Sequence, residues 1–295
     1  MNIKDYCLKI TDVVINIRTL FDIETKCESI NFICDKNEKK DVIIDFIEID
    51  KAENMSGDLI YHGNKNIYQQ KNRIIYEILP FPTMNPYAWL VPINRNKYKM
   101  EYLSGNESYF KYSKSILNII PIDSILNKFG TILLHCSFIE YKGKGILFSA
   151  PSGTGKSTQA NLWNKYEKTE IINGDRAGIR KIKSNWRAYG LPYAGSSNIF
   201  KNKSCLLSYI IILRQGKENR IYKLTPRDAF IKIYSETTIH TWDKEYQENT
   251  INQIMQLVQE VPIYQYECLP DKSAVDFLKE QIIKDRGLVL ENNEF

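Results

Sequence analysis

The sequence contains no Cys-x-x-Cys pair, although it has six cysteines. Because these six are widely scattered, neither a zinc ribbon nor a thioredoxin-like site is indicated, and reduced thiols are the simplest interpretation. The N-terminal segment breaks every apolar run with charges, which is not typical of a signal peptide. The strongest apolar stretch, residues 206–213, is far too short to span a bilayer. These absences predict a cytoplasmic protein with no membrane partner.

A basic stripe interleaved with aromatic residues is also missing. The 40 basic and 35 acidic residues leave a net charge of only +5, which a lysine-rich solvated surface explains. We therefore expect no nucleic-acid partner. The hydrophobic fraction of 43% is enough for a packed core, and 295 residues suggest one large or two modest domains.

Residues 1–112 show short β-branched and aromatic runs, bounded by Lys, Asn, Gly and Pro clusters, and no convincing helical period. This pattern predicts a small β-rich N-terminal domain. The strands are expected at residues 13–17, 30–33, 42–47, 73–79 and 89–91.

Residues 113–295 alternate helical and strand patterns and predict a second, α/β domain. Thr225 followed by Pro226 marks a helix start with a capping residue, and Asp271 marks another. Helices are expected over residues 122–129, 158–166, 229–234 and 271–283, the last one followed by a frayed tail. Strands are expected over residues 131–140, 145–149, 171–175, 207–213 and 261–266.

Residues 150–158, Ala-Pro-Ser-Gly-Thr-Gly-Lys-Ser-Thr, lie between an apolar strand and a helix and match a phosphate-binding loop. The glycines let backbone N–H groups turn toward a β-phosphate, and the helix N-terminus adds its positive end. Lys156 can reach the β- and γ-phosphates, and the Ser157 hydroxyl can ligate Mg²⁺. Ala150 replaces the usual first glycine, which is tolerable if that position needs no positive φ. We expect ATP and Mg²⁺ to be held by Ser152, Gly153, Thr154, Gly155, Lys156, Ser157 and Thr158.

Two common classes of phosphate-loop protein do not fit. No Asn-Lys-x-Asp motif follows the loop, and Asp175 lies too close behind Lys156 to leave room for a GTPase switch segment. The segment Leu-Ser-Gly-Asn at residues 103–106 is an incomplete ABC signature and precedes the loop instead of following it. A kinase-type phosphotransferase is therefore favoured.

Residues 130–180 resemble the HPr kinase/phosphorylase family, whose nucleotide-binding core is shared with the ATP-dependent phosphoenolpyruvate carboxykinases. That family has a histidine fifteen residues before the first loop position, where this chain has His135 before Ala150. It also has an acidic pair after the next strand, where this chain has Asp175 and then Arg176. The resemblance implies an α/β (α+β) fold, with an HPr kinase/PEPCK-like P-loop core beside the smaller β-rich domain.

The same resemblance implies roles for three residues. Asp175 is expected to be the base or a Mg²⁺ ligand together with Ser157, and His135 to hydrogen-bond the aspartate or the phosphates. Arg176 is expected to contact the transferred phosphate in place of a missing carboxylate. Each residue also has an ordinary structural alternative. Asp175 could simply stabilise a turn, His135 could be a hydrogen-bonded histidine within a strand, and Arg176 could form a surface ion pair. The polar residues 195–198 are interpreted as a turn, and His62 and His240 as structural.

The expected function is transfer of the γ-phosphoryl group of ATP to a serine-type hydroxyl of a peptide, protein or small molecule. HPr itself is not expected to be the acceptor, because residues 186–192 lack the family's Glu-Ile-Arg-Gly element. The alternative is a catalytically weak, ATP-binding regulatory protein, which the replacement of the second acid by Arg176 favours. The sequence leaves homo-oligomer formation open.

Overall fold

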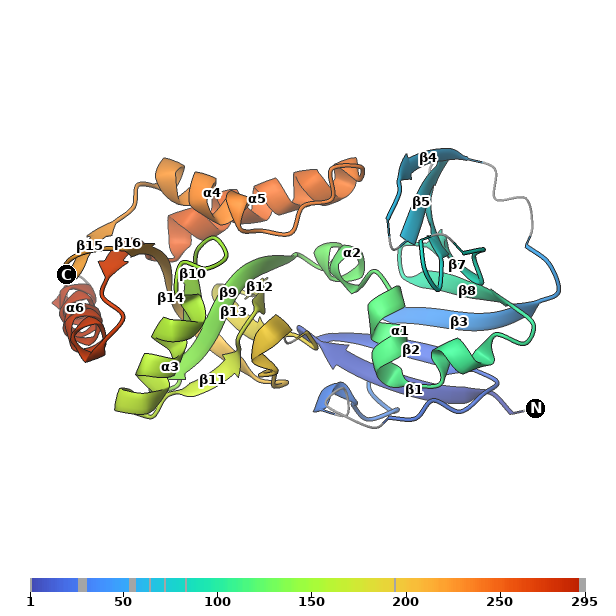
Figure 1. The fold of residues 1–295 in the computed structure, drawn as a ribbon, viewed down its shortest axis with the longest axis horizontal. Coiled ribbons are helices and arrows are strands. Elements are labelled where there is room, and N and C mark those ends of the chain that lie inside the picture. Colours follow the sequence, from blue (N-terminus) through green and yellow to red (C-terminus); the bar gives the residue numbers. More distant parts are fainter. Residues whose placement is uncertain are drawn as a thin grey trace. The chain divides into compact units, whose positions relative to one another are not determined.

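The computed structural model describes residues 2–25, 31–52, 57–63, 65–71, 73–82, 84–193 and 195–291. These residues form a mixed α/β protein with two eight-stranded sheets and six α-helices (Figure 1). The chain divides into two compact units, one of Met1–Phe129 with His240–Tyr246 and one of Gly130–Ile239 with Gln247–Phe295. The first unit thus extends beyond the sequence-based boundary at residue 112 and takes in a short segment from far along the chain.

The first unit is built on a sheet with the strand order β1-β2-β3-β8-β7-β6-β5-β4. Its strands are antiparallel except for the β2–β3 and β3–β8 pairs. Two short helices, α1 (Ser113–Ile119) and α2 (Ile122–Asn127), follow the sheet. The strands are β1 (Lys4–Ile10), β2 (Val13–Thr19), β3 (Val42–Ile49), β4 (Asp58–Tyr61), β5 (Lys65–Gln70), β6 (Arg73–Ile78), β7 (Ala88–Asn94) and β8 (Lys97–Leu103).

Four of the five strands predicted in this unit are present, and one is not. The strand expected at residues 30–33 is wrong over its described part, because Ile33 makes only a single bridge with Leu8. Strand β8 was not predicted because its charged residues obscure the alternation typical of a strand. In the structure Tyr98, Met100 and Tyr102 are buried, and the residues between them are only partly buried.

The second unit holds a sheet with the order β10-β9-β12-β13-β14-β16-β15, and β11 pairs with β9. Strands β10, β14 and β16 are mutually parallel. The strands are β9 (Thr131–Tyr141), β10 (Lys144–Ser149), β11 (Glu170–Asn173), β12 (Arg176–Ile182), β13 (Asn185–Gly190), β14 (Ser204–Gln215), β15 (Arg220–Lys223) and β16 (Ile263–Cys268). The helices are α3 (Lys156–Glu167), α4 (Pro226–Ser235), α5 (Lys244–Glu260) and α6 (Lys272–Glu291).

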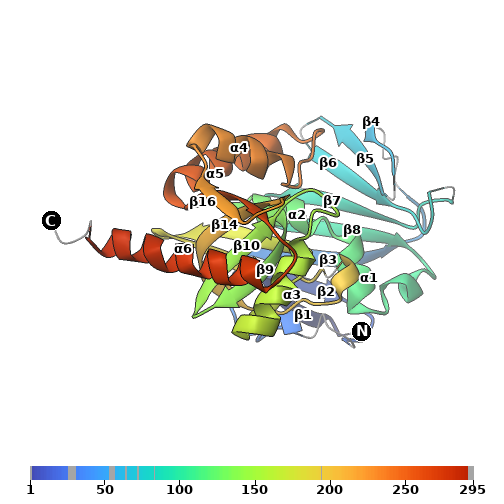
Figure 2. The same ribbon diagram turned by 60° about the vertical axis from the view of Figure 1, so that its left-hand side comes forward.

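Helices cover both faces of this second sheet, which explains the unbroken apolar run in β14. Ile210 and Ile212 pack into the core with α4 and α5, whereas Ile211 and Leu213 pack into the core with α3 and α6. Figures 1 and 2 show the two helix pairs on opposite faces. A strand buried on both faces has no solvent-facing positions, so its sequence does not alternate.

Helix ends follow local chemistry where the capping residues are strong. The Thr225 side chain accepts a hydrogen bond from the Asp228 N–H (3.2 Å) and Pro226 opens α4, as predicted. The prediction of a frayed tail after residue 283 is wrong up to Glu291, because helix α6 continues to that residue. No helix among the described residues combines the length and apolarity needed to cross a membrane.

Candidate active site

The loop between β10 and α3 has the backbone of an anion cradle. Gly153 has φ = +78° and Gly155 has φ = +115°, and nothing lies within 4 Å of the position that a Cβ would take at either residue. Both glycines are therefore required by backbone conformation and not by crowding. Ala150 is fully buried at the end of β10 and is not among the residues with positive φ, so the missing first glycine costs no strain.

Lys156 is the only cation of the loop, and its side chain is turned inward. Its Nζ donates to the backbone carbonyls of Ala150 (2.7 Å) and Pro151 (3.3 Å), and only 8% of the residue is exposed. Burial lowers the pKa of the Lys156 ammonium, while the negative charge of Glu236 opposes that shift. A buried ammonium held by two neutral carbonyls is ready to exchange them for phosphate oxygens.

The other predicted loop residues lie where a nucleotide would reach them. Ser152 and Gly153 are exposed on the loop, and Ser157 and Thr158 are exposed in the first turn of α3. Helix α3 is 12 residues long, so its N-terminus offers unpaired N–H groups and a positive dipole end. The cradle, the buried ammonium and the helix end together fit the phosphates of a nucleotide.

Asp175 stands in a tight turn between β11 and β12. The fully buried Asn173 side chain holds this turn, because its Oδ1 accepts from the N–H groups of Asp175 (2.8 Å) and Arg176 (2.9 Å). Its Nδ2 donates to the carbonyls of Leu191 (3.0 Å) and Tyr193 (2.8 Å). One buried amide thus fixes where the Asp175 carboxylate lies.

The polar segment 195–198 packs directly against this turn. A Cβ at Gly174 would lie 2.2 Å from the Ser197 hydroxyl, and a Cβ at Gly195 would lie 2.7 Å from the Asp175 carboxyl carbon. The short 3-10 helix Gly195–Ser197 therefore touches Asp175 as closely as sterics allow. The turn predicted at residues 195–198 is therefore a short 3-10 helix followed by one turn residue, and this segment packs against the candidate base.

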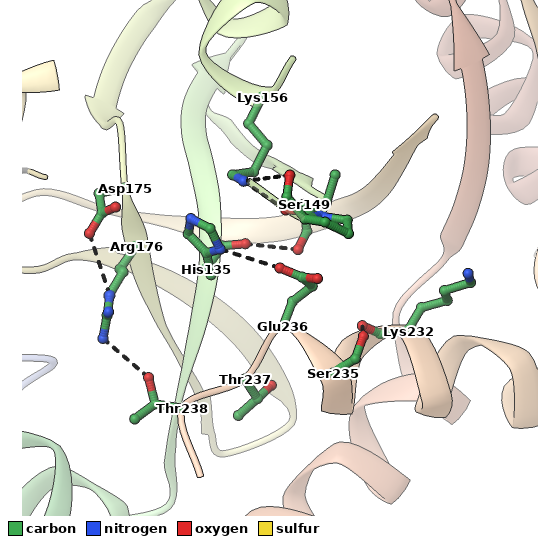
Figure 3. Close-up of polar contacts among 12 residues, drawn as sticks. His135, Ser149, Lys156, Asp175, Arg176, Lys232, Ser235, Glu236, Thr237 and Thr238 are labelled. Carbon is green, nitrogen blue, oxygen red and sulfur yellow. Dashed lines mark hydrogen bonds and ion pairs between the residues drawn. The ribbon is translucent and has the colours of Figure 1, made fainter. Parts of the chain in front are cut away.

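His135, Asp175 and Arg176 are brought together by the pairing of β9 with β12. His135 is the cross-strand partner of Arg176. The Asp175 carboxylate lies 3.4 Å from Arg176 Nε, and Arg176 Nη1 donates to Thr238 Oγ1 (3.2 Å). Figure 3 shows His135 between this pair and Glu236. Ser157 and Asp175, the two predicted metal ligands, make no direct contact in the described part of the chain.

Glu236, directly after α4, is a site residue that the sequence analysis missed. Its Oε2 lies 3.3 Å from His135 Nδ1, and its carbonyl accepts from the His135 N–H (2.9 Å). Its side chain is only 12% exposed. A carboxylate therefore stands near the loop although the position of the second acid holds Arg176. No signal in the sequence pointed to it, since the contact joins residues 101 apart.

A cleft of about 530 Å³ opens between the loop and α4. Pro151 and Thr154 line it from the loop, and Lys232 and Glu236 from the other side. No group of three or more His, Cys, Asp or Glu that could hold a metal occurs among the described residues. Magnesium usually needs only one or two protein oxygens plus substrate phosphates, so the Ser157 hydroxyl and the Asp175 carboxylate are the oxygens of this site that could hold it.

Comparison with known protein families identifies a family that this chain matches. The family described as SynChlorMet cassette protein ScmC matches residues 111–270, which is just over half of the sequence. The chain belongs to this family. The ScmC match contains His135, the loop, Asp175 and Glu236. It is a different family from HPr kinase/phosphorylase, so the sequence resemblance stated above is at most a distant one.

Two further similarities are more limited. The chain is 32% identical over 100 residues to ABC transporter G family member 4 of Dictyostelium discoideum, and the match spans 34% of this chain and 12% of that protein. It is also similar to the Hpr(Ser) kinase/phosphatase of Coxiella burnetii, with 11% identity, 55% of this chain and 94% of that chain covered, and a TM-score of 0.31. Because that score is low, the roles proposed below depend on this chain's own residues.

Proposed function

We propose that this chain is an ATP-dependent kinase, with an HPr kinase/PEPCK-like core, that phosphorylates a serine-type hydroxyl. The observation that carries the proposal is the loop 150–158 between β10 and α3, which has two glycines at positive φ and a buried lysine. Asp175, in the turn between β11 and β12, supplies the candidate base. The acceptor class follows from the resemblance and is a peptide, protein or small molecule.

The residues divide the chemistry between them. Backbone N–H groups of residues 153–158 and the Lys156 ammonium hold the β- and γ-phosphates, and the Asp175 carboxylate accepts the proton of the attacking hydroxyl. The hydroxyl oxygen bonds to the γ-phosphorus as the bond to the β–γ bridging oxygen breaks, which leaves ADP. The Arg176 guanidinium and His135 lie beside Asp175 and face the transferred group. Mg²⁺ would supply charge neutralisation; Ser157 and phosphate oxygens would hold it while Asp175 acts as the base.

A catalytically weak, ATP-binding regulatory protein is the second candidate. The replacement of the family's second acid by Arg176, whose Nε lies 3.4 Å from the Asp175 carboxylate, favours it.

The experiment that separates the two is phosphoryl transfer from labelled Mg-ATP to a library of serine-containing peptides. We expect ADP release together with label on a serine, and no label on purified HPr. Tight ATP binding with no transfer to any acceptor would support the regulatory protein. Failure to bind ATP at all contradicts both.

Glu236 gives a sharper prediction within this function. Glu236→Gln removes the charge that orients His135, so we expect kcat to fall about 10- to 100-fold, the effect of losing one hydrogen bond to a charged group. The KM for ATP should change little, so the loss should appear in kcat alone.

A matched control is Glu260→Gln, which makes the same substitution at a carboxylate outside the site. Glu260 pairs with Lys181 (2.7 Å). That variant should keep wild-type kinetics. Equal kcat values for the two variants, or a Glu236→Gln loss that appears in KM instead of kcat, contradict the positioning role of Glu236.

A further inference from the structure

The first unit contains a cleft of about 730 Å³ that the proposed phosphoryl transfer does not use. Its walls come from the turn between β5 and β6, the β7–β8 hairpin, the end of α2 and residues 242–245, all within this unit. Figure 2 shows β5, β6, β7 and β8 as neighbours in the sheet. The lining holds five basic side chains and two acidic ones. We call it the cationic cleft and define it by Lys71, Arg73, Arg95 and Lys128.

These four cations have no carboxylate partner among the residues that the structure describes. Arg73 Nε donates to the Gln70 amide oxygen (2.8 Å), Arg95 to the carbonyl of Lys128 (2.8 Å), and Lys128 Nζ to the Tyr98 hydroxyl (2.9 Å). By contrast, Lys97 on the same hairpin pairs with Asp45 (3.4 Å). Three of these cations are held by neutral groups, and all four leave positive charge around the cleft for a ligand.

The wall at residues 242–245 is fixed by a chain of buried hydrogen bonds. The Tyr76 hydroxyl donates to Ser124 Oγ (3.2 Å), which lies 3.1 Å from His240 Nδ1. His240 Nε2 lies 2.7 Å from Asp123 Oδ2. Trp242 then stacks on His240, with ring centroids 4.7 Å apart. The cleft is thus preorganised, so a ligand would not have to order this wall on binding.

We propose that the cationic cleft binds an acidic peptide segment of a partner protein. The cations stand on separate elements, so several spaced carboxylates match them better than one compact anion does. The half-buried Trp242 ring and the 47% exposed Ile93 offer contacts for an apolar side chain between those acids. Asp243 and Glu245 on the same wall repel any anion placed against them. A peptide can put an uncharged residue there, whereas a continuous phosphate backbone cannot, which favours a peptide over a nucleic acid.

Fluorescence anisotropy with a labelled Glu-Ala-Glu-Leu repeat peptide tests this proposal without any need for catalysis. We expect binding that weakens as salt is added, because the contacts are exposed ion pairs. The double variant Arg73→Gln with Arg95→Gln should weaken binding about two- to thirtyfold, as expected for two exposed ion pairs. Lys71→Gln alone, at an exposed turn, should weaken it less and carries little risk to folding.

The control is the double variant Lys165→Gln with Lys183→Gln, which removes the same charge from exposed positions of the second unit. It should bind the peptide as the wild type does. Three results overturn the proposal: no binding of the acidic peptide, equal loss in both double variants, or tighter binding of a single-stranded oligonucleotide. Circular dichroism melts confirm that each variant is folded. Because phosphoryl transfer is not measured, failure here leaves the proposed kinase function standing.

Discussion

Asp175→Asn is expected to lower turnover by about two to four orders of magnitude, the usual contribution of a general base. Asparagine has nearly the same shape, so the hydrogen bonds that Asn173 makes to the backbone of this turn remain and the fold is kept. What disappears is the group that accepts the hydroxyl proton. ATP affinity should be largely unchanged, because the phosphates are held by the loop and by Lys156.

The measurement is steady-state ADP release with an acceptor peptide, or basal ATP hydrolysis before an acceptor is known, beside calorimetric titration of Mg-ATP. Asp276→Asn is the matched control, since Asp276 lies exposed on α6 and pairs with Lys272 (2.7 Å). Turnover near the wild-type value in Asp175→Asn means that Asp175 only shapes the turn. An equal fall in the control points to a general loss of folded protein.

Lys156→Ala is expected to reduce Mg-ATP affinity by about two orders of magnitude, in line with the loss of hydrogen bonds from a charged donor. The loop 150–158 carries no other cation, so nothing replaces the ammonium at the β- and γ-phosphates. In the structure the same ammonium holds the carbonyls of Ala150 and Pro151. Alanine leaves those carbonyls without this donor, which should cost some thermal stability as well.

Lys165→Ala, in the last turn of the same helix, is the control for lost charge and lost side-chain volume. Lys165 is exposed and lies over the Tyr166 ring, away from the loop. Calorimetry should find wild-type affinity for this variant. Unchanged affinity in Lys156→Ala would falsify the assignment of residues 150–158 as a phosphate-binding loop, whatever the acceptor is.

Strong local patterns predicted the fold best. The strands β10 and β14 and the start of α4 depend on neighbours in sequence: apolar runs, a capping threonine and a proline. Helix α5 was missed because its sequence is mostly polar and only a narrow strip, Ile254, Leu257 and Val258, reaches the core. Its spacing of three and four residues was the available signal.

Strands β12 and β13 were missed for a related reason. Arginine and lysine interrupt β12, and asparagine and arginine interrupt β13. Such residues suggest a break in a strand, although they can occupy its less buried positions. Tertiary pairing with β9 and β14 decides these strands. Strand propensity is weak compared with such pairing, so the sequence alone could not establish them.

For this protein, the sequence by itself determined the conformation of the loop 150–158, since the glycines, Lys156 and the start of α3 act through adjacent backbone groups. Only the tertiary structure brought Glu236 to His135 and packed residues 195–197 against Asp175. It alone also added residues 240–246 to the first unit and so completed the cationic cleft. The physical reason is that these contacts join residues far apart in the chain, where packing and strand register, and not local propensity, decide which side chains meet.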